Sequence, residues 1–189
     1  MSDQSTRCAW AKKTLDILYH DREWGVPLKD DKQLFEFLIL EGVQAGLSWS
    51  TVLQRREAYR EAYDHFDPKL VATYSQQKID TLLSNPALIR NKLKILASVK
   101  NARAYIQTQQ AHGSFSQYLW SYVDHTPIIN AWQTADQIPN VTALSQAMSK
   151  DLKKRGFSFV GPTICYALMQ ATGLVNDHLT TCFRHSELS

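Results

Sequence analysis

The sequence predicts an all-α fold, and three observations point to it. Apolar residues recur at helical spacing, no segment shows the sustained alternation of a strand, and only 7 glycines interrupt the 189 residues. At this length the chain suits one domain, with or without a small second lobe. Such a chain buries roughly 70% of its unfolded surface, so we expect a real core.

Three patterns predict helices in the first part of the chain. Asp30 and Asp31 stand where N-caps belong. The apolar stripe behind them consists of Leu34, Phe35, Leu38, Ile39 and Val43. Asp67 and Pro68 are a second cap, with proline at the first helical position. A further stripe consists of Ile89, Leu93, Leu96 and Lys100, widened by Ile95 and Val99. Each stripe predicts one buried helix face.

The second half of the chain predicts two helices and a long loop. One helix should run from Thr142 to Arg155, with Gly156 as its stop. Another should run from about Pro162 to Thr172 and end at Gly173. Residues 125–141 are rich in Pro, Asn and Thr, so we expect a loop there.

Composition indicates the cellular compartment and the kinds of ligand that the protein could bind. The N-terminus lacks an apolar secretory core and no apolar run is long enough to span a bilayer, so the cytosol is the expected compartment. Three cysteines in an unsecreted chain argue against a disulfide framework and leave metal binding or burial. A net charge of +3 permits nucleic-acid binding without requiring it.

Two cysteines and two histidines lie near the chain ends. Cys8 and His20 are near one end, and His178 and Cys182 near the other. The second pair is spaced i, i+4, which places both side chains on one face of a helix. Two Cys and two His form a closed tetrahedral set that suits structural zinc and leaves no open catalytic position. Four unrelated core residues are the alternative, and spacing alone favours it.

Residues 41–49 resemble the wall of a ligand pocket. Glu41 follows an apolar helix face, so its carboxylate should be desolvated and should need a partner. The residues alone favour a structural pairing with an arginine or a backbone N–H, with a ligand amino group as the second option. The candidate flat walls are Trp10, Tyr19, Trp24 and Trp49. The alternative is that these rings fill the core.

Residues 153–163 predict a helix–hairpin–helix turn. Gly156 and Gly161 permit a tight backbone, and Pro162 suits the first turn of the next helix. Free N–H groups at that helix start could bind a phosphate beside Lys153, Lys154 and Arg155. The basic segment 90–94 could extend this face. An ordinary turn with solvated lysines is the alternative.

Taken together, these motifs closely resemble the bacterial type I 3-methyladenine DNA glycosylases. The matching stretches are residues 7–10, 19–27, 40–49, 89–92, 154–157, 159–161 and 173–178. The resemblance implies the all-α helix-hairpin-helix glycosylase scaffold, as one domain over residues 1–189 with a cleft between two helical lobes. It implies a DNA repair enzyme that flips out 3-methyladenine and hydrolyses its N-glycosidic bond. The free base is released and an abasic site remains.

The resemblance also assigns residues. It implies a structural zinc held by Cys8, His20, His178 and Cys182, which joins the chain ends around residues 8–20 and 178–182. It implies that Glu41, the assigned catalytic residue, hydrogen-bonds the base. The base would lie against Tyr19, Trp49, Trp10 and Trp24. The expected contacts to double-stranded DNA are Gly46, Leu47, Ser48, Arg155, Gly156, Gly161 and Thr163. Leu47 would be a wedge in the vacated gap, with a core position as the alternative.

The implied mechanism depends mainly on recognition. 3-Methyladenine is cationic in DNA and leaves as a neutral base, so no strong general acid is needed. We expect a monomeric enzyme that does not nick the strand. Asp177 is a candidate to stabilise the sugar cation, but a contact with the metal ligand His178 is equally compatible. Asp124 fits a turn residue better.

Asp16 departs from the family, which often carries a tyrosine there. If Asp16 faces the pocket, its charge could change which base is bound. Two other functions remain open at this point. One is a zinc-stapled DNA-binding module without catalysis, and the other is a zinc hydrolase, which would need an open metal position.

Overall fold

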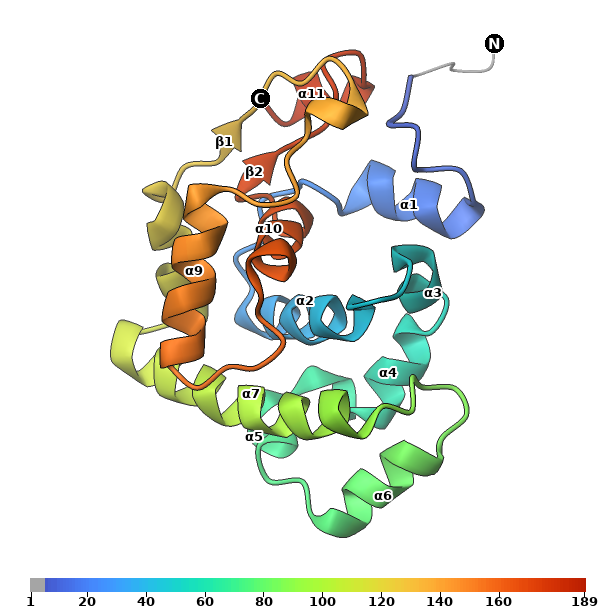
Figure 1. Cartoon of the computed structure of the whole chain (residues 1–189), viewed down its shortest axis with the longest axis vertical. Coiled ribbons are helices and arrows are strands. Elements are labelled where there is room, and N and C mark those ends of the chain that lie inside the picture. The colour runs from blue at the N-terminus through green and yellow to red at the C-terminus, as the bar shows by residue number, and fades with distance from the viewer. Residues whose placement is uncertain (1–5) are drawn as a thin grey trace.

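A computed structural model describes residues 6–189 (Figure 1). The expected domain of residues 1–189 includes residues 1–5, which lie outside the described residues. The α-helices are α1 (Thr14–Arg22), α2 (Asp31–Gln44), α3 (Trp49–Leu53), α4 (Arg56–Ala62), α5 (Pro68–Val71), α6 (Gln76–Ser84), α7 (Lys92–His112), α8 (Phe115–Trp120), α9 (Ala143–Lys154), α10 (Pro162–Ala171) and α11 (Phe183–Glu187). Short 3₁₀ turns are η1 (Asp64–Phe66), η2 (Ser121–Val123) and η3 (Ala135–Gln137).

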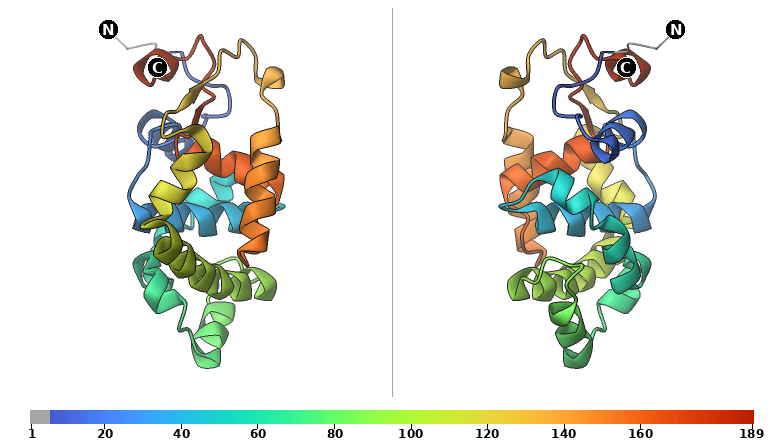
Figure 2. Two further views of the ribbon diagram at one scale, coloured as in Figure 1. Left: turned by 90° about the vertical axis from the view of Figure 1, so that its left-hand side faces the viewer. Right: turned by 90° about the vertical axis from the view of Figure 1, so that its right-hand side faces the viewer.

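Helix α2 forms the centre of the molecule, with α7 on one side and α10 on another (Figures 1 and 2). Asp30 caps it by accepting a hydrogen bond from the Gln33 N–H, as predicted. Every residue from Leu34 to Val43 is buried, so α2 is enclosed on all sides. The side chain of Glu41 is therefore buried by its place in the central helix.

The predicted apolar face of α7 is only partly correct. Helix α7 begins after Asn91, whose side chain accepts from the Lys94 N–H, so Ile89 lies outside the helix. Leu93 is 68% exposed, while the buried face carries Ile95 and Val99. The helical period counted from Ile89 selects Leu93 and Leu96, which are exposed, because Ile89 precedes the cap and lies outside the helix.

The other predicted helix ends are confirmed. The side chain of Asp67 accepts hydrogen bonds from the N–H groups of Lys69 and Leu70 at the start of α5. Thr142 caps α9 in a capping box. Gly173 follows α10 with a φ of +72°, a conformation that favours glycine.

The expectation of no strand needs a small correction. β1 (Ile128–Ile129) pairs in parallel with β2 (Val175–Asn176). Two residues are too few to show alternation in the sequence. This pairing ties the predicted loop 125–141, which also contains η3, to the segment that precedes His178.

The first described residues and the C-terminal segment lie side by side (Figure 1). The backbone N–H of Phe183 donates to the carbonyl of Thr6 at 3.1 Å. Within residues 6–189, no helix has the length and apolar character needed to cross a membrane.

Candidate functional site

A cavity of about 330 Å³ lies among α1, α2, α3, α10 and the loop around η3. Its aromatic walls are Trp10, Tyr19, Trp24 and Trp49. The ring centroids of Tyr19 and Trp49 are 5.2 Å apart, as are those of Trp10 and Trp24. Trp10 is 40% exposed. The rings predicted from the sequence therefore meet around one cavity, and the alternative that they all fill the core is wrong.

Glu41 lines this cavity and is only 3% exposed. Its Oε2 atom is buried and has no hydrogen-bond partner among the described residues. Burial raises the pKa of this carboxyl from 4.5 to about 8. The structural pairing that the sequence favoured is therefore wrong. The buried glutamate of α2 that does pair with arginine is Glu36, which binds Arg56 at 2.5 Å and Arg60 at 2.8 Å.

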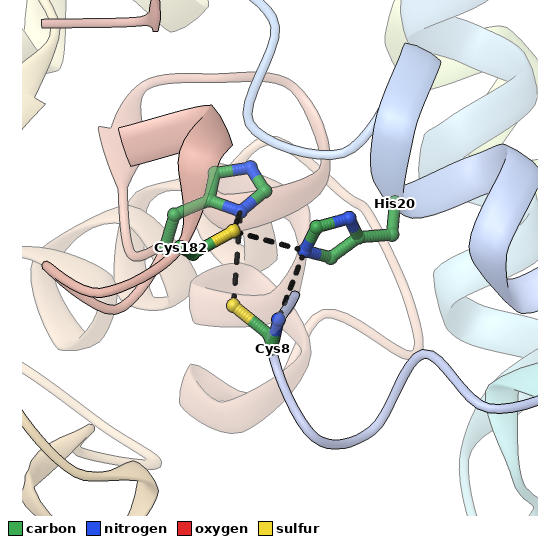
Figure 3. Close-up of side chains that lie close together, drawn as sticks. Cys8, His20 and Cys182 are labelled. Carbon is green, nitrogen blue, oxygen red and sulfur yellow. Dashed lines mark hydrogen bonds between the residues drawn. The ribbon is translucent and has the colours of Figure 1, made fainter. Parts of the chain in front are cut away.

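The four predicted Cys and His residues form a buried cluster. The ligating atoms of Cys8, His20, His178 and Cys182 all lie within 4.8 Å of one another. Cys182 Sγ lies 3.4 Å from His20 Nε2 and 3.5 Å from His178 Nδ1. Figure 3 shows Cys8, His20 and Cys182 pointing toward one another. Ligands on a tetrahedral zinc stand about 3.3–3.8 Å apart. Three pairs of donor atoms in the cluster are 3.4 to 3.7 Å apart, so the group could hold such an ion.

The second histidine nitrogens are held away from the cluster. His20 Nδ1 donates to Asp21 at 2.8 Å, and His178 Nε2 donates to the Trp24 carbonyl at 3.0 Å. Both bonds aim the other ring nitrogen at the cluster, as partners of metal-bound histidines do. The hydrogen bond between the two sulfurs lowers the pKa of Cys182 and raises that of Cys8, which favours one thiolate.

One detail of the cluster differs from the prediction. His178 and Cys182 lie in a turn before α11 and not on a helix. The i, i+4 spacing gave the right juxtaposition for the wrong reason, because a tight turn also brings such residues together.

The hairpin joins α9 to α10 as predicted. Gly156 has a φ of +97°, whereas Gly161 has an ordinary φ of −62°. A Cβ atom on Gly161 would meet no protein atom within 4 Å. The chain itself therefore does not require glycine there. Arg155 Nε donates to Asp151 at 2.7 Å, and the guanidinium lies over the Tyr118 ring, so the protein holds this side chain in place through its Nε and its ring contact.

A surface loop leads from α2 to α3. Gly46 has a φ of +80°, and Ser48 caps α3. Leu47 between them is 39% exposed, so the alternative that it is a core residue is wrong. Lys94 Nζ donates to the carbonyls of Val43 and Ala45, at 2.7 and 2.6 Å. It thus holds the end of α2 instead of extending a phosphate-binding face.

Three aspartates considered above have distinct settings. Asp177 is 1% exposed and accepts four hydrogen bonds, which leaves it no free position for a water. Asp124 is a turn residue with a left-handed backbone. Asp16 is buried with Oδ1 unpartnered among the described residues, and it does not line the cavity.

Sequence reasoning missed several residues of the cavity wall. They are Gln44, Ala135, Ile138, Asn140, Ala167 and Gln170. Gln170 had a usable signal, because it is a polar residue in the otherwise apolar second half of α10. The residues from 135 to 140 had only the length of their loop.

The comparisons with known proteins agree in one family. Residues 10–185 match the family described as methyladenine glycosylase. The chain is 50% identical over 179 residues to DNA-3-methyladenine glycosylase of Haemophilus influenzae, covering 94% of this chain and 97% of the relative. It is 50% identical over 177 residues to DNA-3-methyladenine glycosylase 1 of Escherichia coli, covering 93% and 95%.

Solved structures give the same result. A crystal structure of 3-methyladenine DNA glycosylase I superposes with a TM-score of 0.92 at 50% identity, covering 94% of this chain and 98% of that one. A variant of 3-methyladenine DNA glycosylase I in complex with 3-methyladenine has a TM-score of 0.91 at 40% identity, covering 94% and 96%.

Proposed function

The chain belongs to the methyladenine glycosylase family, and from this premise we propose that it excises 3-methyladenine from alkylated DNA. The enzyme hydrolyses the N-glycosidic bond, releases the free base and leaves an abasic site. The observation that carries the proposal is the unpartnered, buried carboxyl of Glu41 inside an aromatic cavity. Such a group needs a donor from a ligand, and a purine amino group supplies one.

Recognition accounts for most of the proposed catalysis. The cationic base lies against Trp49 and Tyr19, with Trp10 and Trp24 as further walls. Glu41 binds its amino group and is stabilised as a carboxylate by the positive charge. Normal adenine is neutral and gains less from these contacts. A damaged base is also cheaper to extrude from the stack.

The leaving group departs neutral, so the cleavage step needs no strong acid. Glu41 is the catalytic residue of the proposal because it contacts the base that carries the charge. The four hydrogen bonds on Asp177 argue against a role for it in orienting the attacking water. Among residues 6–189, no lysine lines the cavity, which supports a monofunctional enzyme that forms no Schiff base with DNA.

We assign a structural zinc ion to Cys8, His20, His178 and Cys182. The ion would join two segments that are about 160 residues apart and would add no chemistry to base removal, because a closed set of four protein ligands leaves no open position. The same closed set argues against a zinc hydrolase.

We assign the contact with double-stranded DNA to the hairpin and to the loop from Gly46 to Ser48. The hairpin contributes Arg155, Gly156, Gly161 and Thr163, and backbone N–H groups at the start of α10 would bind phosphate. The protein acts as a single helix-hairpin-helix domain and as a monomer.

The direct test of function is to incubate the protein with methylated duplex DNA and to separate the released bases by chromatography. We expect free 3-methyladenine and intact strands that break only on later treatment of abasic sites. Tight, salt-sensitive DNA binding without base release would instead support the DNA-binding module.

Leu47→Ala is expected to lower excision from duplex DNA by about tenfold, because the apolar wedge is lost. Its affinity for free 3-methyladenine and its melting temperature should not change, since Leu47 is exposed. Leu70→Ala, at an exposed leucine on α5, is the matched control and should affect none of the three measurements. Equal excision rates for both variants would remove Leu47 from the DNA contact.

Gly161→Ala is expected to weaken duplex binding about tenfold, because its Cβ would hold the phosphate backbone away from the helix start. The protein itself accommodates the Cβ at an ordinary φ, so the melting temperature should stay the same or rise slightly. Binding is measured by fluorescence anisotropy at fixed salt. Unchanged DNA affinity would move the DNA contact away from this turn.

A further inference from the structure

Gln170 presents one defined side of its amide to the cavity. It lies at the end of α10 and lines the cavity, and its Nε2 donates to Asp177 Oδ2 at 2.8 Å. The structure gives its Oε1 no partner within residues 6–189. The carbonyl oxygen is therefore the group that is free to meet a ligand.

Asp177 prevents this amide from turning over. Its two oxygens accept from Asn130 Nδ2 at 2.7 Å, Trp132 Nε1 at 2.8 Å, Tyr166 Oη at 2.6 Å and Gln170 Nε2. An indole N–H can only donate, and an ionised carboxylate can only accept. A flipped Gln170 would place its carbonyl oxygen against a buried carboxylate oxygen and lose a charge-assisted hydrogen bond.

The position of Gln170 indicates which edge of the base it meets. It lies eight residues after Pro162, where the hairpin ends, which is roughly 12 Å along the helix. A flipped-out base keeps its sugar edge toward the DNA. Because Gln170 lines the cavity together with Glu41 and lies that far from the hairpin, we expect it to face the opposite edge, where adenine carries an amino group with two N–H donors. Glu41 accepts one of them, and Gln170 Oε1 is available for the other.

We propose that Gln170, with its amide held by Asp177, is a specificity-determining residue that selects a 6-amino purine over a 6-keto purine. This inference rests on the proposed function. A keto oxygen at the same position would face the Gln170 carbonyl, acceptor against acceptor. Asp177 is then a positioning residue, which acts through Gln170 and does not touch the base.

The test compares the affinities of two free bases, 3-methyladenine and 3-methylhypoxanthine, in which a keto oxygen replaces the amino group. Wild type should prefer 3-methyladenine by at least about tenfold, as expected when a site would leave a polar group unpaired. Gln170→Met keeps the length of the side chain and removes the acceptor. It should lose most of this preference through weaker binding of 3-methyladenine. Equal loss of affinity for both bases would overturn the proposal.

Two further variants test the role of Asp177. Asp177→Asn allows the Gln170 amide to reverse, so the preference should shrink although Gln170 is still present. Tyr166→Phe removes another donor from the same carboxylate but leaves the bond to Gln170, so the preference should remain. Melting temperature and zinc content identify variants that fold poorly. An undiminished preference in both Asp177→Asn and Gln170→Met would overturn the proposal. Failure of wild type to bind or release 3-methyladenine would overturn the proposed function instead.

Discussion

Glu41→Gln is expected to weaken the binding of free 3-methyladenine by roughly tenfold to a hundredfold, the range expected for a hydrogen bond to a charged group. Glutamine has almost the same shape but keeps one acceptor only, and it carries no negative charge to strengthen the hydrogen bond from the amino group of the base. Because Glu41 has no partner in the protein, this loss should not be accompanied by unfolding. Calorimetric titration with the free base measures the effect.

The same substitution should change how stability depends on pH. The carboxyl of Glu41 has a pKa of about 8 in the folded protein, raised by burial from 4.5. Between these pH values the folded state holds a proton that the unfolded state has lost. The contribution of Glu41 to stability therefore falls as pH rises from 4.5 to 8, and it levels off above that. Glu41→Gln removes this slope, so the variant should be more stable than wild type at alkaline pH, by an amount on the order of a few kcal/mol.

Glu36→Gln is the matched control. Glu36 is another buried glutamate of α2, but it binds Arg56 and Arg60. Its substitution should lower the melting temperature and leave base affinity unchanged. If Glu41→Gln bound 3-methyladenine as tightly as wild type does, Glu41 would not be part of the binding site.

Cys182→Ser is expected to lower the melting temperature by about 10 °C and to reduce the zinc content sharply, since loss of a structural ligand costs several kcal/mol. The cluster joins segments from both ends of the chain, so its loss frees most of the polypeptide. The fraction that stays folded should still release 3-methyladenine. Calorimetry, metal analysis and the base-release assay give the three quantities.

Cys165→Ser separates metal loss from the loss of a buried thiol. Cys165 is buried outside the cluster, and its Sγ donates to the Val160 carbonyl at 3.4 Å. A serine hydroxyl can make the same bond, so stability and zinc content should change little. If the Cys182→Ser variant were fully folded but inactive, the metal would have a role beyond stabilising the fold.

Features that depend on nearby residues could be predicted from the sequence. The caps at Asp30 and Asp67 were predicted correctly because each depends on a side chain and the N–H groups two or three residues away. The burial of Glu41 was also predictable, because the apolar residues around it exclude a solvated helix.

Features that depend on distant partners were not predictable. Which of the two buried glutamates of α2 pairs with arginine depends on where Arg56 and Arg60 lie in the fold, and both bind Glu36. The role of Lys94 depends on two carbonyls about 50 residues away in the sequence. The orientation of Gln170 depends on Asp177, and no local pattern encodes it.

The meeting of the chain ends also sets an order of events during synthesis. Cys8, His20 and Trp10 leave the ribosome about 160 residues before Gln170, His178 and Cys182 do. The cluster and the cavity draw residues from both groups, so neither can close on a nascent chain. A chain that stopped before Cys182 would lack one residue of the Cys and His cluster. A chain that stopped before Gln170 would also lack part of the cavity wall. The cavity can therefore be complete only after the chain has been made beyond Gln170.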